Sequence, residues 1–181
     1  LAFACLHAPL HDEEAVDNLI ELIAKEQPDC VVHLGDGHEM SWASRFEDAG
    51  EVDAISEYDA HNKILKQIRV ASPNSRRIFM PGNHEWRLYS PRIEPCIRSA
   101  LHWKRHQDEM QHWEEPCRYL NCRHRGVFRI GQVTFCHGHS CSASGVKKET
   151  TTMAREWGLY VHGHLHRPTQ PGPPERVMAT T

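Results

Sequence analysis

The sequence lacks the features that mark membrane-spanning, secreted and nucleic-acid-coating proteins. It contains no run of about 18 apolar residues, so no segment reads as a membrane span. No basic segment precedes the apolar residues 1–4, and we expect a strand there rather than a signal peptide. Acidic and basic side chains nearly balance, 24 against 21, which gives a net charge of −3. This balance provides no general attraction to nucleic acid or to an acidic membrane.

Internal repeats, low-complexity tracts and flexible linkers are also missing, and 181 residues suit one ordinary domain, so we expect a single domain over residues 1–181. The 7 cysteines are an odd number without regular close pairs. This argues against a disulfide framework and favours a reducing, cytoplasmic setting. The compositional excess is in histidine, with 15 residues. Because histidine is both a common metal ligand and a common structural residue, only position can separate the two roles.

Short apolar runs alternate with longer segments of helical period, which predicts a layered α/β domain. A helix is expected to begin after Asp12, because apolar residues from Val16 to Ile23 repeat at helical spacing, and to end before Pro28. Further helices are expected over 53–71, within 94–113 and over 145–157. Strands are expected over 1–6, 30–34, 77–80, 159–161 and 177–179, with a hairpin over 126–136 that turns at Gly131.

Five short blocks rich in possible metal ligands fall mostly at the ends of the expected strands. In chain order they are Cys5-Leu6-His7, Gly35-Asp36, Gly82-Asn83-His84-Glu85, His137-Gly138 and Gly163-His164-Leu165-His166. Any single block could be an ordinary turn, since Asn and Asp favour turns. Open α/β sheets gather their ligand sites at the carboxyl ends of strands, so residues distant in sequence can converge there. Imidazole and amide ligands suit borderline metals such as Mn, Fe, Zn or Ni. We interpret His164 and His166 as lying on an extended segment, where residues two apart point the same way.

The ordered blocks resemble the calcineurin-like metallophosphoesterase superfamily, whose motifs are D-x-H, G-D, G-N-H-[DE], H and G-H-x-H. The match spans nearly the whole chain, and the small size is similar to that of compact, often microbial or phage-encoded members. One position departs from the pattern, because Cys5 stands where the family has an aspartate. The resemblance implies a four-layer α/β/β/α sandwich that binds two divalent transition metal ions, Mn, Fe, Zn, Ni or Co.

The same resemblance implies a role for each residue of the blocks. The first metal would be held by Cys5, His7, Asp36 and His166, and the second by Asp36, Asn83, His137 and His164, with Asp36 bridging. A hydroxide that bridges both metals would hydrolyse a phosphomonoester or a phosphodiester. His84 would assist departure of the leaving group or hold the phosphoryl group, and Arg87 is the best candidate for a substrate contact.

Two interpretations of Cys5 are open. As a thiolate ligand it would favour Zn²⁺ or Fe²⁺ over Mn²⁺; as a buried apolar residue it would leave the first site weak or empty.

Several other polar and aromatic residues also keep two interpretations. Glu39 and Glu85 are expected to be structural or supporting groups rather than metal ligands, and either could orient a metal-bound histidine. Phosphate contact or simple solvation is open for the cations Arg92, Lys147, Lys148 and Arg167. His139 and His162 are expected either to contact the ligands from behind or to lie on a strand face. A separate zinc site is disfavoured at Cys117, Cys122 and His124. Base stacking or core packing is open for Trp86, Trp103 and Trp113.

We therefore expect an enzyme that acts on a phosphate ester, with no membrane contact and no specified oligomeric state. Two other functions stay open. One is a non-catalytic scaffold with the same fold, which the retention of His84 and of all ligands but one argues against. The other is a nuclease subunit that acts with a partner. Nucleic acid is a possible substrate, but the balanced charge does not indicate it.

Overall fold

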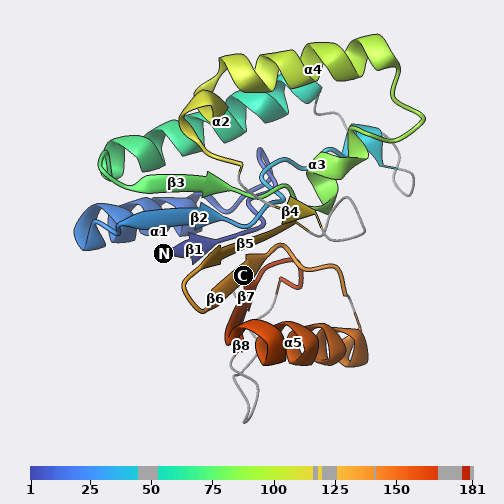
Figure 1. Cartoon of the computed structure of the whole chain (residues 1–181). Coiled ribbons are helices and arrows are strands. Elements are labelled where there is room, and N and C mark those ends of the chain that lie inside the picture. The colour runs from blue at the N-terminus through green and yellow to red at the C-terminus, as the bar shows by residue number, and fades with distance from the viewer. Residues whose placement is uncertain (45–52, 116–117, 120–125, 141, 167–176, 180–181) are drawn as a thin grey trace.

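The computed structural model describes residues 1–44, 53–115, 118–119, 126–140, 142–166 and 177–179 (Figure 1). In chain order the elements are β1 (Ala2–Phe3), α1 (Glu13–Glu26), β2 (Cys30–His33), η1 (Ser41–Ala43), α2 (Ala54–Ala71), β3 (Arg76–Phe79), α3 (Asn83–Arg87), α4 (Pro95–Gln107), η2 (Glu109–His112), β4 (Arg118–Tyr119), β5 (Gly126–Ile130), β6 (Val133–Cys136), α5 (Ala143–Trp157), β7 (Leu159–His162) and β8 (Val177–Ala179). Among these described residues no helix is both long enough and apolar enough to cross a membrane.

The strands of the described residues form two sheets, ordered β1-β2-β3 and β4-β5-β6-β7-β8. All strands of the first sheet are parallel, and Phe3, His33 and Phe79 lie side by side in its ladder. The residues that follow these three positions therefore leave the sheet at the same edge. In the second sheet β6 and β7 are parallel, and Cys136 pairs with His162. In each sheet, the loops that carry the candidate histidines therefore lie at one edge.

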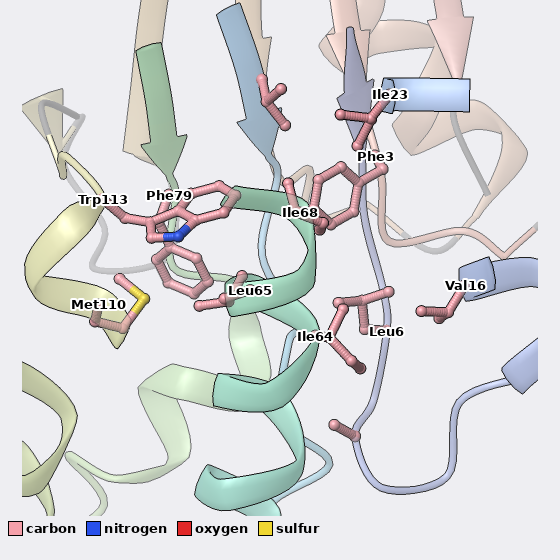
Figure 2. Close-up of a cluster of buried hydrophobic side chains, with 12 residues drawn as sticks. Phe3, Leu6, Val16, Ile23, Ile64, Leu65, Ile68, Phe79, Met110 and Trp113 are labelled. Carbon is pink, nitrogen blue, oxygen red and sulfur yellow. The ribbon is translucent and has the colours of Figure 1, made fainter. Parts of the chain in front are cut away.

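The two sheets stack face to face between helices, which gives the α/β sandwich that the sequence predicts (Figure 1). Figure 2 shows the core beneath α2, where Ile64, Leu65 and Ile68 pack against Phe3 and Phe79 of the first sheet. A second core fills the space between the sheets and contains Ala4, Val32, Leu34, Ile78, Met80, Phe128 and Val161. Consecutive residues of β2 alternate between these cores, with Val31 in the first and Val32 in the second.

Side-chain caps fix the starts of the long helices that cover the first sheet. Asp12 accepts a hydrogen bond from Ala15 N at 3.0 Å, and Asp53 accepts from Ile55 N at 2.8 Å. The predicted helices after Asp12 and over 53–71 are confirmed, as is the hairpin that turns at Gly131.

One local prediction is wrong, and the error falls beside the predicted ligand Cys5. The first strand spans Ala2–Phe3 instead of residues 1–6, because Cys5 has a left-handed backbone with φ 57°. The block from Gly82 to Glu85 contains the start of a helix that the sequence analysis does not predict, since α3 begins at Asn83. Glu85 reaches back to Gly82 N at 2.7 Å, and this contact stabilises the start of a helix too short to show a period.

Candidate metal centre

The five predicted blocks meet at the common edge of the two sheets, where backbone hydrogen bonds join their loops. Cys5 N donates to Gly35 O at 2.9 Å, and His7 N donates to Asp36 O at 3.0 Å. In the second sheet Gly163 N donates to His137 O at 3.1 Å. These bonds hold the loops after β1 and β2 together, and likewise the loops after β6 and β7.

Side chains that could ligate a metal gather there in three overlapping groups. Within each group the ligand atoms all lie within 4.8 Å of one another; the groups are Cys5, His7 and His166; Cys5, Asp36 and His137; and His7, Asp36 and His84. The third group shows that distance alone does not separate His84 from the ligands. Asn83, which the resemblance adds as a ligand, contacts His137, with Oδ1 2.9 Å from Nε2.

Five of the predicted ligands have backbones in the left-handed region. Their φ angles are 57° at Cys5, 50° at His7, 53° at Asp36, 75° at His164 and 51° at His166. Residues other than glycine rarely adopt such angles, and the strain, of order 1–3 kcal/mol per residue, concentrates at functional sites. The interpretation of 164–166 as an extended segment is therefore wrong. Left-handed turns, rather than strand geometry, direct these two imidazoles.

His137 faces oxygen atoms of two other predicted ligands. Its Nδ1 donates to Leu34 O at 2.8 Å, so Nε2 is the atom that faces Asn83 Oδ1, 2.9 Å away, and Asp36 Oδ2, 3.1 Å away. Burial lowers the pKa of His137, but the Asp36 carboxylate outweighs this effect and raises it. Ligands about 2.0–2.2 Å from a metal and at right angles lie about 3 Å apart. The three atoms have the charge and spacing that fit a cation.

His7 and His166 make a similar arrangement on the other side of Asp36. His7 Nδ1 lies 2.8 Å from Glu39 Oε2, and because a carboxylate only accepts, Nδ1 carries the hydrogen. His7 Nε2 then points its lone pair at His166 Nε2, 3.1 Å away. Burial lowers the pKa of His7, which favours the neutral ring. A carboxylate that orients an imidazole in this way is the usual support of a metal-bound histidine.

Cys5 lies between these two arrangements. Its Sγ accepts a hydrogen bond from His164 N at 3.3 Å and belongs to both cysteine-containing groups. Burial raises the pKa of the Cys5 thiol to about 12, and the Asp36 carboxylate acts in the same direction. The thiol is therefore protonated near neutral pH. A bound cation would reverse this, because a coordinating thiol loses its proton.

His84 and Arg87 form a pair beside Asp36. His84 N donates to Asp36 Oδ1 at 2.8 Å, and His84 Nδ1 donates to the backbone oxygen of Glu39. Arg87 Nη2 lies 3.0 Å from His84 Nε2, while Nη1 donates to the backbone oxygens of Glu39 and Met40. Burial lowers the pKa of His84, Asp36 opposes this and Arg87 adds to it. Arg87 is thus held against His84, and its predicted contact with substrate stays a prediction.

Glu85 has the structural role that is one of the two expected for it. Its buried carboxylate accepts hydrogen bonds from Asp36 N at 3.0 Å and Gly37 N at 2.8 Å, as well as from Gly82 N. It joins the loop that carries Asp36 to the loop that carries Asn83. The two loops are so close that a Cβ on Gly82 would lie 2.2 Å from Asp36 Oδ1.

The remaining candidate residues lie away from the centre or outside the described residues. Trp113 belongs to the core, and Trp86 packs against Tyr89. His139 Nδ1 lies 3.0 Å from Glu149 Oε2, and His162 is buried. Solvent exposure is observed for Arg92, Lys147 and Lys148. The side chain of Trp103 and the residues Cys117, Cys122, His124 and Arg167 fall outside what the structure describes.

A family model identifies the family to which the chain belongs. Residues 1–168 match a family model described as calcineurin-like phosphoesterase. Among solved structures the chain is similar to YfcE, a phosphoesterase from E. coli, with 14% sequence identity and a TM-score of 0.40; the match covers 99% of this chain and 75% of that chain. A comparison with curated proteins gives no match.

Proposed function

The chain belongs to the calcineurin-like phosphoesterase family, a family of metal-dependent hydrolases, and on that premise we propose that it hydrolyses phosphomonoesters or phosphodiesters at a centre for two cations. The observation that carries the proposal is the convergence of possible ligand atoms on both sides of Asp36. Asp36 Oδ2, Asn83 Oδ1 and His137 Nε2 form one such set, and His7 Nε2 and His166 Nε2 form another. Nitrogen and oxygen atoms about 3 Å apart have the spacing of ligands around one cation.

The side chains divide into two ligand sets that share Asp36. We assign Cys5, His7, Asp36 and His166 to the first cation, and Asp36, Asn83, His137 and His164 to the second. Nitrogen, amide and thiol donors fit Mn, Fe, Zn, Ni or Co better than Mg²⁺, which prefers an all-oxygen shell. When bound, two such cations neutralise phosphate oxygens and increase the acidity of water.

The chain's own residues complete the chemistry beside this centre. Arg87 brings a permanent positive charge to within 3.0 Å of His84, and we assign both residues to the phosphoryl group. His84 is the candidate proton donor to the departing alkoxide. Its Nδ1 donates to the backbone oxygen of Glu39, so the proton would pass through Nε2, the atom that lies 3.0 Å from Arg87 Nη2. Glu39 meanwhile holds the His7 ring, with its carboxylate 2.8 Å from His7 Nδ1.

The test combines metal analysis with hydrolysis of p-nitrophenyl phosphate and bis-p-nitrophenyl phosphate by the full chain. Dialysis against a chelator should abolish hydrolysis, and Mn²⁺, Co²⁺ or Ni²⁺ should restore it better than Mg²⁺. Asp36→Asn is the matched variant, because it keeps the size of the side chain and removes the shared charge, and it should lower both metal content and turnover. Full activity in chelator would contradict the proposal, as would a metal-loaded protein that hydrolyses neither ester.

A further inference from the structure

Three histidines outside the five blocks form a buried chain behind the metal centre. His33 lies on β2, His38 follows Asp36 by two residues, and His61 lies on α2; each is at most 1% exposed. His33 Nε2 is 3.4 Å from His61 Nε2, and His61 Nδ1 is 3.1 Å from His38 Nε2. At the two ends, Gly35 N lies 3.0 Å from His33 Nδ1, and His38 Nδ1 lies 3.2 Å from Glu85 Oε1.

The groups at the two ends of this row of histidines, Gly35 N and the Glu85 carboxylate, fix the direction of every hydrogen bond between the rings. A peptide N–H only donates, so His33 Nδ1 accepts from Gly35 and the hydrogen of a neutral His33 is on Nε2. His33 then donates to His61 Nε2, which places the His61 hydrogen on Nδ1, facing His38 Nε2. His38 in turn donates from Nδ1 to the Glu85 carboxylate, which only accepts. One tautomer of each ring satisfies all four contacts.

Aromatic rings surround the three histidines, and His33 is neutral. Burial lowers the pKa of His33 to about 3, which favours its neutral ring. Aromatic rings enclose the imidazoles, with Phe3 at 4.5 Å and Phe79 at 4.9 Å from His33, and Tyr58 at 4.5 Å from His38, between ring centroids. A neutral imidazole has one donor and one acceptor, so each ring donates one hydrogen bond and accepts one.

Glu85 connects this chain to the metal ligands. The Glu85 carboxylate accepts a hydrogen bond from His38 N at 3.2 Å and lies 3.2 Å from His38 Nδ1. The same carboxylate holds the backbone amides of Asp36, Gly37 and Gly82. His61 also lies directly beneath this loop, because a Cβ on Gly37 would be 2.4 Å from His61 Nε2.

We propose that His33, His61 and His38 act as a positioning chain for the metal centre. Through the hydrogen bond from His38 Nδ1 they hold the Glu85 carboxylate in place, and Glu85 sets the distance between the loop of Asp36 and the loop of Asn83. His61, on α2 and far in sequence from every ligand, therefore controls cation affinity without touching a cation. This role rests on the proposed function, since it requires that Asp36 and Asn83 bind metal.

The first experiment reads the tautomers directly in the full wild-type chain. Nitrogen-15 NMR of labelled imidazoles should show neutral rings, with the hydrogen on Nδ1 in His38 and His61 and on Nε2 in His33. The Nδ1–H form is the minor one for free neutral histidine, so a histidine that is merely packed in the core would not show it. A His61 ring with its hydrogen on Nε2 would refute the proposed order of hydrogen bonds through His33, His61 and His38.

The second experiment measures Mn²⁺ binding by calorimetry for three variants of α2. His61→Leu fills the space without hydrogen bonding and should raise the dissociation constant about tenfold or more. His61→Asn keeps a donor near the Nδ1 position and should recover part of the affinity. Ile68→Ala is the control, because Ile68 is fully buried on the same helix. Its apolar side chain forms no hydrogen bond with His33, His38 or His61.

The control separates positioning from general loss of stability. Ile68→Ala should lower the melting temperature and leave the Mn²⁺ dissociation constant near that of the wild type. If His61→Leu and His61→Asn bind Mn²⁺ as the wild type does, the positioning role is wrong while the proposed function stands. If the wild type itself binds neither Mn²⁺ nor Zn²⁺, the proposed function fails, and the positioning role fails with it. If His61→Leu does not fold, His61→Asn and the tautomers of the wild type decide the question.

Discussion

Replacing Cys5 by aspartate should change how many protons leave the protein when a cation binds. The buried Cys5 thiol has a pKa of about 12, so at pH 7 its deprotonation costs about 7 kcal/mol. A thiophilic cation must supply this free energy before the sulfur can bind, whereas an aspartate at the same place would already be ionised. The left-handed backbone at Cys5, with φ 57°, is one that aspartate adopts more readily than most residues. The substitution should therefore be compatible with the local fold.

The assay is calorimetric titration of the metal-free protein with Zn²⁺ in two buffers of different ionisation enthalpy. The wild type should release about one proton more than Cys5→Asp for each protein molecule. Its log Kd should also change more steeply with pH, by about one unit per pH unit between about pH 6 and 8. Cys5→Asp should bind Mn²⁺ more tightly and support faster hydrolysis with Mn²⁺, because the cost of removing the thiol proton disappears.

A matched control comes from the second cysteine near the sheet. Cys30, on β2, is partly exposed and belongs to none of the three ligand groups, so Cys30→Ala should release as many protons as the wild type. With Co²⁺, the wild type and Cys30→Ala should show thiolate-to-metal absorption that Cys5→Asp lacks. Equal proton release by the wild type and Cys5→Asp, together with no such absorption in the wild type, would refute thiolate ligation. The alternative of a buried apolar Cys5 would then hold.

Three further predictions concern other parts of the structure. His84→Ala should lower kcat about 10²-fold with metal content retained, whereas Asn83→Ala should lower metal content; equal metal loss in both variants would make His84 a ligand. Gly82→Ala should weaken Mn²⁺ binding and lower the melting temperature, because the added Cβ would meet Asp36 Oδ1 at 2.2 Å. Burial raises the pKa of Glu57 to about 7, so the unfolded chain loses this proton first as pH rises. The free energy of unfolding should fall by about 3 kcal/mol between about pH 4.5 and 7, and urea titrations of Glu57→Gln should lack that fall.

Local signals in the sequence predict most of the fold and the membership of the candidate site. Asp12 and Asp53 cap helices whose apolar residues repeat at helical spacing, and Gly131 marks the hairpin. The order of the five blocks predicts which side chains converge. Periodicity carries no information about Cys5, whose left-handed backbone depends on a hydrogen bond from its N to Gly35 O across the sheet.

Long-range contacts between polar side chains are also beyond the reach of sequence patterns. Glu85 binds backbone amides 48 and 49 residues away, and His61 meets His38 and His33 at separations of 23 and 28 residues. No regular spacing encodes such pairs, because they depend on how α2 and the first sheet dock. From sequence alone, His33, His38 and His61 cannot be distinguished from ordinary histidines, because their contacts depend on the packing.

The candidate ligands come from both sheets, and this division links metal supply to the assembly of the molecule. Cys5, His7, Asp36 and Asn83 follow strands of the first sheet, whereas His137, His164 and His166 follow β6 and β7 of the second. Cations bound by ligands from both sheets would hold the two sheets together. At a free concentration 100 times the dissociation constant, one such ion stabilises the folded state by about 2.7 kcal/mol. Starvation for metal would then loosen the contact between the layers as well as stop turnover, and degradation of the apo-protein would follow the metal status of the cell.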